Sequence, residues 1–498
     1  LIPDGVGISR STGAAYKKAK FDHEILPAGS KFLLRIKWVE ECYESDKKEK
    51  EKFEADRKVR EQILAVALAE WQNGRAWLGG NKARGLGRFK LENIEMKEVK
   101  LGENDPEYLI EYLLEPQPAL AKNKAWLPVE KDWIESLLPK NEQGEVRKNV
   151  QDAKHHSARN LITFTGELNF DSAFLSNYPM VAARSGFDHA PMLDRMRDQA
   201  GNPIISGASL RGALRSHAEK IALTIATQVA LTQLKSSEYE DVRKEFLKMC
   251  PACDPLAQQQ EHETLPLANC DSRWRKHKKD KEVLAEDELC LSCQLFGSAR
   301  LGSRFLVEDA LWAGDEPKAD SWKAQDFLAI DRFTGDGLEG AKFDAAPLIR
   351  PRFKFRLHLS NAEAWEIGWL ALVLRDLKDG LITVGFGAAK GYGRATLEKL
   401  EWQIGYIHES DLPLDGMAKM KADKASYAGL YRFISGKQGD NDDAWLAILD
   451  QGVEAFNTEI REFRMEKEED KVPFDDDTWM KRDKKHEESL LALYHTEA

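Results

Sequence analysis

Five of the six cysteines in this chain fall within one short window. The window holds two C-x2-C pairs, which are Cys250/Cys253 and Cys290/Cys293. Each pair supplies two thiolate ligands from one tight turn, and two pairs complete the tetrahedral ligand set of a structural zinc site. We therefore expect these four cysteines to bind zinc, with Cys270 or His262 able to replace one of them. Reduced, buried thiols without a metal are the alternative.

A second candidate for chemistry is the polar loop GFDHAPMLD at residues 186–194. Asp188, His189, Asp194 and the nearby Asp198 are residue types that bind a divalent cation or transfer a proton. Isolated aspartates in loops also form turns, so a structural role is the alternative for each of them.

Two further segments have residues suited to phosphate groups. In GASLRGALR, at residues 207–215, a Gly-Ser turn precedes a helix, whose first N–H groups attract anions near Ser209. Arg211 and Arg215 lie one turn apart on that helix. An ordinary capped helix with solvated arginines is the alternative.

Two glycine-rich loops, GGNKARGLGR at residues 79–88 and GFGAAKGYGR at residues 385–394, would let a ligand approach the main chain closely. Their basic residues are Arg84, Arg88, Lys390 and Arg394, and Tyr392 adds a ring for base stacking. Neither loop has the spacing of a nucleotide-triphosphate loop, and a turn between two strands is the alternative.

These segments belong to an internal repeat. ISRSTGAAYKKAKFD at residues 8–22 matches IDRFTGDGLEGAKFD at residues 330–344, and Arg10 corresponds to Arg332. Each motif precedes an alternating apolar strand, KFLLRIKW or RFKFRLHL, and then a helix and a glycine-rich loop. Only the second copy has a long segment ahead of its motif. We expect another segment or chain to supply the missing half of the first copy.

The composition indicates a folded protein without a transmembrane helix. The chain has 498 residues, 42% hydrophobic and 9% aromatic, which is too apolar for disorder. No run approaches the roughly 20 apolar residues of a transmembrane helix, and the first residues do not have the charged-then-apolar pattern of a secretion signal, so we expect a cytoplasmic protein. The net charge of −11 opposes a simple nucleic-acid coat. The acids concentrate in helical stretches at residues 40–56 and 466–477, and we expect the first of these to stay clear of RNA.

In order, the motifs resemble the RAMP superfamily of CRISPR-associated proteins, and more narrowly the backbone subunits of type III effector complexes. The order is GFDHAP, NPIISGASLRGALR, CLSCQLFGSARLGSR, FLAIDRFTG and GFGAAKGYGR. The resemblance implies tandem RRM-like (ferredoxin-like) α+β domains with antiparallel sheets and a hairpin before residue 330. The expected boundaries are residues 1–100 for the later half of a first unit, 101–158 for a connector, 159–405 for a complete unit with a zinc-binding insertion at about 245–300, and 406–498 for a charged helical segment.

The resemblance also implies partners and an activity. The partners are guide CRISPR RNA, single-stranded target RNA and other effector subunits of a prokaryotic antiviral ribonucleoprotein. In this family an acidic loop residue cuts target RNA with a divalent metal, Mg²⁺ or Mn²⁺, and by position that residue is Asp188, with Asp194 or Asp198 as substitutes. The residues implied to contact RNA are Ser209, Arg211, Arg215, Arg332, Lys390, Tyr392, Arg394, Arg10, Arg84 and Arg88.

Three other interpretations remain open at this stage. The chain could hold guide RNA without cutting. It could process guide RNA with a histidine base such as His155, His156 or His189. It could also be a zinc-stabilised scaffold unrelated to CRISPR.

Overall fold

The computed structural model describes residues 4–8, 15–22, 24–36, 38, 47–74, 76–96, 127–128, 160–194, 201–233, 241, 246, 250–255, 270–271, 289–299, 301–314, 321–407, 409–420, 432–437 and 442–463. Several predicted site residues lie outside these ranges, namely Arg10, His155, His156, Asp198 and His262. Most of the expected connector at residues 101–158 lies outside them too. None of the described helices combines the length and the apolar composition that a bilayer span requires.

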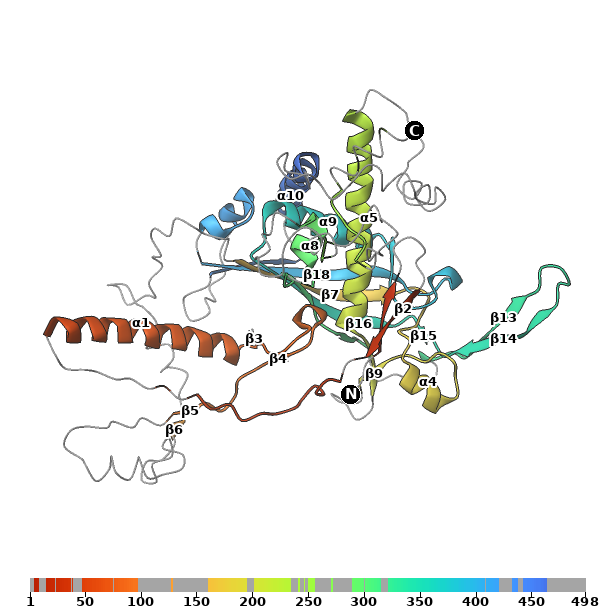
Figure 1. Cartoon of the computed structure of the whole chain (residues 1–498), viewed down its shortest axis with the longest axis horizontal. Helices are drawn as coiled ribbons and strands as arrows, with labels where there is room; N and C mark the ends of the chain where they lie inside the picture. Colours follow the sequence, from red (N-terminus) through yellow and green to blue (C-terminus); the bar gives the residue numbers. More distant parts are fainter. Residues whose placement is uncertain are drawn as a thin grey trace.

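The centre of the molecule is an antiparallel sheet with helices packed on one face (Figure 1). Its strands run in the order β17-β18-β7-β16-β12-β10-β9, and β11 pairs with β16. Taken along the chain, β7, α5, β11, β16, α9 and β18 form a β-α-β-β-α-β series, the arrangement of a ferredoxin-like fold. The elements are β7 (Asn160–Phe170), β9 (Leu193–Asp194), β10 (Asn202–Ile205), α5 (Gly207–Gln233), β11 (Phe305–Val307), β12 (Ala310–Trp312), β16 (Arg352–Ser360), α9 (Ala364–Lys378), β17 (Ile382–Thr383) and β18 (Arg394–Tyr406).

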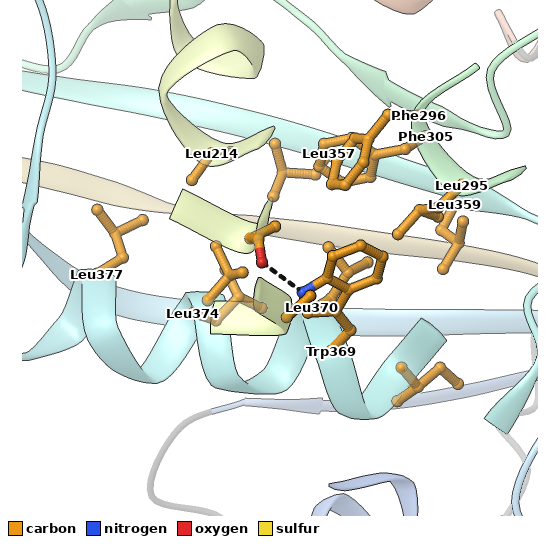
Figure 2. Close-up of a cluster of buried hydrophobic side chains, with 14 of the residues drawn as sticks. Leu214, Leu295, Phe296, Phe305, Leu357, Leu359, Trp369, Leu370, Leu374 and Leu377 are labelled. Carbon is orange, nitrogen blue, oxygen red and sulfur yellow. Dashed lines mark hydrogen bonds between the residues drawn. The ribbon is translucent and has the colours of Figure 1, made fainter. Parts of the chain in front are cut away.

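Sequence periodicity explains this core. Buried and half-buried residues alternate along the whole of β7, as expected for a strand with one covered face. Figure 2 shows leucines of α9 packed with Phe296, Phe305 and the apolar face of β16. Within this core the indole N–H of Trp369 donates to the Ala218 carbonyl of α5 at 2.9 Å.

The segment expected to be charged and helical, residues 406–498, contributes both a strand and a helix to the preceding unit where it is described. β19 (Arg432–Lys437) pairs with β18, and α10 (Asp442–Glu462) packs on α9, where Phe456 stacks on Trp369. A Cβ on Gly368 would collide with the Gly452 carbonyl, so the two helices need glycine at this crossing. The apolar stripe of α10 therefore completes the core of the preceding unit.

A two-stranded hairpin, β13 (Gln325–Ile330) and β14 (Gly337–Ala345), projects away from the sheet (Figure 1). The resemblance implies a hairpin before residue 330, whereas in this hairpin only β13 lies there and the turn and β14 follow it. Its base joins β8 (Ala173–Phe174), β15 (Leu348–Ile349) and the short helix α4 (Pro179–Ser185). Near the cysteines lies α8 (Leu291–Phe296).

The first copy of the repeat forms the corresponding hairpin with the same register. β1 (Asp4–Ile8) pairs with β2 (Ala15–Asp22), joining Gly5 to Phe21 and Val6 to Lys20. β13 and β14 join the residues 322 positions later, Phe327 to Phe343 and Leu328 to Lys342, and the register shifts at the same place in both hairpins. The sequence repeat is therefore also a repeat of backbone structure.

The two glycine-rich loops likewise share one backbone, at an offset of 306. The first copy has α1 (Lys47–Gln72), β3 (Ala76–Trp77), the 3₁₀ turn η1 (Lys82–Arg84) and β4 (Arg88–Phe89), whereas the second has β17, η5 (Ala388–Lys390) and β18. The N–H of Leu78 donates to the Gly87 carbonyl and that of Val384 to the Gly393 carbonyl, each at 2.8 Å. Gly87 and Gly393 both have positive φ, and a Cβ on either would collide with the opposing carbonyl oxygen. The remaining described strands are β5 (Glu95–Met96) and β6 (Leu127–Pro128).

One predicted strand is not formed. The described residues of KFLLRIKW, at 31–36 and 38, belong to no helix or strand. Its counterpart β16 is held by β7 on one side and by β11 and β12 on the other. No described segment of the first copy supplies such neighbours, and a strand without a partner loses its hydrogen-bond ladder.

Candidate functional site

The acidic loop 186–194 is joined to the end of the hairpin by two aspartates. The backbone N–H of Asp188 donates to Asp344 Oδ1 at 2.7 Å, and the N–H of Asp344 donates to Asp188 Oδ2 at 2.9 Å. The neighbouring His189 extends the junction, since its N–H donates to the Asp344 carbonyl and its carbonyl accepts from Ala346. The hydrogen bonds with Asp344 fix the position of the Asp188 carboxylate. Because Asp188 is exposed, the carboxylate is also accessible to a ligand.

Aromatic rings and one lysine complete the surroundings of this loop. The ring of His189 lies between Phe343 of the hairpin and Phe386 of the second glycine-rich loop. The ammonium of Lys390 lies 5.3 Å from the Phe343 ring centroid and 5.6 Å from those of Phe327 and Phe386. Cation–π attraction of this kind holds a charge in place at a partly exposed site. The acidic loop, the hairpin and the second glycine-rich loop therefore meet at one surface, which has both acidic and basic side chains.

The first copy of the repeat has an equivalent of the contact between the basic residue and the phenylalanine. The guanidinium carbon of Arg84 lies 5.1 Å from the Phe21 ring centroid, and these residues correspond to Lys390 and Phe343. Asp22 occupies the register position of Asp344. Asp344 was not predicted as a site residue, although the shared KFD at residues 20–22 and 342–344 was a signal for it.

We expect Asp344 to position the acidic loop through its side-chain acceptor. Asp344→Ala removes the bond to the Asp188 N–H, whereas Asp344→Asn keeps an oxygen in the same place. The alanine variant should therefore lose about 10-fold or more in any activity that depends on Asp188, and the asparagine variant should retain most of it. Cleavage rates of the two variants, compared at equal RNA occupancy, check this. Equal losses in both would instead indicate that the negative charge of Asp344 matters.

The cysteines form a second site, and it differs from the expected one by one residue. The sulfur atoms of Cys253, Cys270, Cys290 and Cys293 all lie within 4.8 Å of one another, and all four residues are buried. Cys250 is not part of this group, and its thiol donates to the Ala252 carbonyl instead. Cys270, which we had expected only as a substitute, takes its place. The C-x2-C spacing predicts Cys250 as a ligand because spacing reflects only residues that are close in sequence. The position of Cys270 beside the other three sulfurs depends on the tertiary fold, which the spacing does not contain.

The four sulfurs suit zinc. A tetrahedral Zn–S₄ site, with bonds near 2.3 Å, separates its sulfurs by roughly 3.8 Å, and Cys253 Sγ lies 3.5 Å from Cys293 Sγ. Backbone N–H groups of Cys253 and Cys290 point to the sulfurs of Cys290 and Cys270, as they do toward thiolate ligands. Hydrogen bonding among the sulfurs and burial raise the pKa of the Cys253 thiol, so four thiolates there require a compensating cation.

Arg211 and Arg215 were expected to contact RNA, but the structure places their guanidiniums against the cysteine loop. Arg215 is only 8% exposed, and it pairs with Glu219 at 2.7 Å and lies 3.9 Å from Cys293 Sγ. Arg211 donates to the Phe296 carbonyl and to Ser303. A buried, fully engaged guanidinium cannot also hold a backbone phosphate, so for Arg215 the expected RNA contact is replaced by a structural role.

The start of α5 is similarly occupied. The N–H of Gly207 donates to Asp309 Oδ1 at 2.8 Å, and the N–H of Ser209 donates to the Ser206 hydroxyl at 3.2 Å. A Cβ on Gly207 would meet the carbonyls of Val307 and Arg84. This turn therefore serves mainly as the docking surface of the first glycine-rich loop.

An ion-pair network holds that loop in place. Arg88 Nη1 donates to both carboxylate oxygens of Glu308 at 2.8 Å, and His358 Nε2 lies 2.6 Å from the same carboxylate. His358 Nδ1 lies 3.1 Å from the Thr163 hydroxyl, which suits a neutral imidazole. Burial acts to raise the pKa of Glu308, but the hydrogen bond from His358 and the charges of Arg88 and Arg356 outweigh it, so the pKa is lowered. Burial lowers the pKa of His358, although Glu308 opposes this.

These two shifts predict acid sensitivity. At His358 the unfolded state binds more protons than the folded state does. The contribution of His358 to the free energy of unfolding is therefore present above its ordinary pKa of 6.5 and is lost as the pH falls below that value. Glu308 contributes above its ordinary pKa of 4.5 and loses its contribution as the pH falls through the lower folded value. We expect Glu308→Gln to reduce the free energy of unfolding by about 1–3 kcal/mol at pH 7, measured by chemical denaturation between pH 4 and 8.

The matched control for this network is Glu398→Gln, which changes an exposed glutamate of β18 on the same sheet. It should leave both the stability and the acid profile within about 0.5 kcal/mol of the unmodified protein. If the free energy of unfolding depended on pH in the same way in Glu308→Gln and Glu398→Gln, that result would contradict a stabilising role for the ion-pair network.

Other predicted RNA contacts differ in accessibility. Arg332, Lys390 and Arg394 are exposed, and Arg394 forms a long ion pair with Asp171 at 3.9 Å. Tyr392 is buried, and its hydroxyl donates to Gln325, so its ring is not available for base stacking. β9 includes Asp194, but the described features of that residue are limited to its backbone pairing with Asn202.

Comparison with known proteins agrees with the fold. Residues 181–396 match the family described as the RAMP superfamily. This stretch runs from α4 to the first residues of β18 and so contains the acidic loop, the cysteines, the hairpin and the second glycine-rich loop. The match supports the RAMP family for this part of the chain and, with it, a CRISPR-associated RNA-binding role. No curated protein matches the sequence.

Proposed function

We propose that this protein is a backbone subunit of a type III CRISPR effector complex, in which two RAMP units follow one another in one chain. It holds guide CRISPR RNA, acts with other effector subunits in the prokaryotic cytoplasm, and cuts complementary target RNA at Asp188. The observation that carries the proposal is the fixed, exposed carboxylate of Asp188 at the base of a projecting hairpin, within the RAMP-matching stretch.

The tandem arrangement is supported by the two repeats of backbone structure. Both the hairpin register and the glycine-loop hydrogen bonds recur at constant offsets, and in each copy a basic residue of the loop lies over the phenylalanine of KFD. Lys390 gives the second copy exposed positive charge beside the acidic loop, and Arg332 in the hairpin turn and Arg394 at the start of β18 add exposed positive charge, which suits a ribose-phosphate strand.

The chemistry proposed is attack of a ribose 2′-hydroxyl on the adjacent phosphate. The Asp188 carboxylate accepts the proton of that hydroxyl and the new O–P bond closes a 2′,3′-cyclic phosphate. The bond to the 5′-oxygen breaks, and that oxygen takes a proton from solvent water to leave a 5′-hydroxyl. The hairpin would hold the target strand bent at this point, so that the attacking oxygen, phosphorus and leaving oxygen align. Asp344 keeps the Asp188 backbone fixed during the reaction.

A divalent cation, Mg²⁺ or Mn²⁺, is part of the proposal. Asp188 would hold it, with Asp344 as a neighbouring carboxylate. When bound, such an ion neutralises charge on the phosphate. Separately, Cys253, Cys270, Cys290 and Cys293 would bind a structural zinc ion that joins the cysteine loop to α5 through Arg215.

The test is to assemble the complex on a defined guide and add a complementary, end-labelled target RNA with Mg²⁺. Cleavage at regular intervals with cyclic-phosphate and 5′-hydroxyl ends is the expected result. Guide protection from nuclease without target cleavage would instead support a non-cutting, RNA-holding subunit. Absence of any bound RNA would contradict both.

A further inference from the structure

His189 follows Asp188 in the acidic loop, and its backbone continues the loop along the base of the hairpin. Its N–H donates to the Asp344 carbonyl at 3.2 Å, its carbonyl accepts from the Ala346 N–H at 2.9 Å, and the residue forms a parallel bridge with Ala345. Because Asp188 is exposed, water competes for the hydrogen bonds of this junction, which by themselves hold the loop only weakly.

The imidazole ring of His189 supplies a second, apolar attachment. It lies 4.5 Å from the Phe386 ring centroid, with an interplanar angle of 37°, and 5.6 Å from the Phe343 ring centroid in an edge-to-face arrangement. Aromatic pairs at these distances attract each other beyond the area that they bury. Phe343 belongs to β14 and Phe386 to the second glycine-rich loop, so this one ring joins the acidic loop to two other segments.

The internal repeat indicates that Phe386 is not needed to fold its own loop. The equivalent residue of the first glycine-rich loop is Gly80, and a Cβ there would meet no atom within 4 Å. The two loops nevertheless have the same turn and the same closing hydrogen bond of 2.8 Å. A phenylalanine at residue 386 therefore serves contacts outside its loop, and these include the His189 ring and the Lys390 ammonium.

The nitrogens of His189 are poorly placed for proton transfer. Nδ1 is buried and has no hydrogen-bond partner in the described part of the chain. A protonated imidazole is a donor at both nitrogens, and a buried N–H without an acceptor is unfavourable. A positive charge on His189 would also lie against two of the rings that already bind the Lys390 ammonium, and repulsion between like charges opposes this.

We infer that His189 is a positioning residue for the Asp188 site. Its ring, rather than either nitrogen, holds the acidic loop between the hairpin and the second glycine-rich loop, and it transfers no proton during cleavage. The part of this inference that concerns the reaction rests on the proposed function. The part that concerns anchoring does not, because it depends only on contacts between three segments of the chain.

Three substitutions separate the ring from its nitrogens. His189→Phe keeps an aromatic ring and removes both nitrogens. His189→Asn removes the ring but keeps a polar atom near the position of Nδ1. Phe386→Gly removes the partner ring and gives residue 386 the side chain that the first glycine-rich loop has at Gly80, so the loop itself should still fold.

Target cleavage is measured in the assembled complex at saturating RNA over a range of pH values. His189→Asn should reduce the single-turnover rate by at least about 10-fold, whereas His189→Phe should stay within about 3-fold and keep the pH dependence of the unmodified complex. Phe386→Gly should reduce the rate about as much as His189→Asn. Combining these two changes should cost little more than either alone, because both remove the same contact.

Amide hydrogen exchange of the full chain without RNA gives a readout that does not need cleavage. The Ala346 amide, which donates to the His189 carbonyl, should exchange at least about 10-fold faster in His189→Asn and Phe386→Gly, but not in His189→Phe. Amides of β7 and β16 in the same data report whether each variant is folded.

Two results would overturn the inference. If His189→Phe lost as much activity as His189→Asn, or shifted the pH dependence, a nitrogen of His189 would take part in the reaction. If exchange at Ala346 were the same in all variants, the ring would not anchor the loop. An unmodified complex that binds guide RNA without cutting would contradict the proposed function, and the exchange data would still decide whether the ring anchors the loop.

Discussion

Replacing Asp188 with alanine is expected to reduce target-RNA cleavage by about 10²–10⁴-fold while leaving RNA binding unchanged. The carboxylate is the group proposed to accept the 2′-hydroxyl proton, and its position is fixed by the reciprocal bonds with Asp344. Because Asp188 is exposed, alanine removes the chemistry without opening a cavity. Single-turnover cleavage of a guide-complementary RNA, together with a binding measurement on the same complex, checks both parts.

Asp379→Ala is the matched control, since Asp379 is an exposed aspartate at the end of α9 and is not near the acidic loop in the chain. It should cut at the unmodified rate. If Asp188→Ala also cuts at that rate, Asp188 is not the cutting residue, and Asp194 and Asp198 become the next substitutions to make. If Asp188→Ala loses RNA binding as well as cleavage, Asp188 has a structural role, and its hydrogen bonds with Asp344 would be enough to explain the loss.

Local patterns predicted the sequence repeat, but they did not predict the hairpin that its first motif forms, and the strand expected at residues 31–38 is absent from the described residues. Glycine spacing identifies Gly87 and Gly393 because positive φ and a close carbonyl are requirements of the backbone itself. The repeated motif was not predicted to form a hairpin, although the register of each hairpin depends on a turn and two short strands that are adjacent in sequence. These are properties that neighbouring residues determine without help from distant ones.

Side-chain roles that depend on distant packing were predicted less well. Arg215 looked like a surface arginine one helical turn from Arg211, but the cysteine loop folds back over α5 and buries it against Cys293. Tyr392 looked available for stacking, yet the base of the hairpin covers it. Asp344 was missed because its partner lies 156 residues away in the chain. In each case the deciding contact joins segments that sequence periodicity treats separately.

The cysteine group leads to the second large expected effect. Cys290→Ser should lower the free energy of unfolding by at least about 3 kcal/mol and abolish stoichiometric zinc binding. Cys290 is fully buried in the four-sulfur group and is the N-cap residue that precedes α8, so its loss removes both a ligand and the anchor of the loop against Cys253 and Cys270. Zinc content by mass spectrometry and thermal unfolding with and without a chelator measure the effect.

Cys250→Ser separates zinc ligation from burial of a thiol. Cys250 is also buried and belongs to a C-x2-C pair, but its sulfur lies outside the group and bonds to the Ala252 carbonyl, which a serine hydroxyl can also do. It should keep one zinc per chain and lose less than about 1 kcal/mol. Cys270→Ser should instead behave like Cys290→Ser. The reverse result, with Cys250 required and Cys270 dispensable, would restore the paired C-x2-C ligand set and contradict the geometry of the four sulfurs.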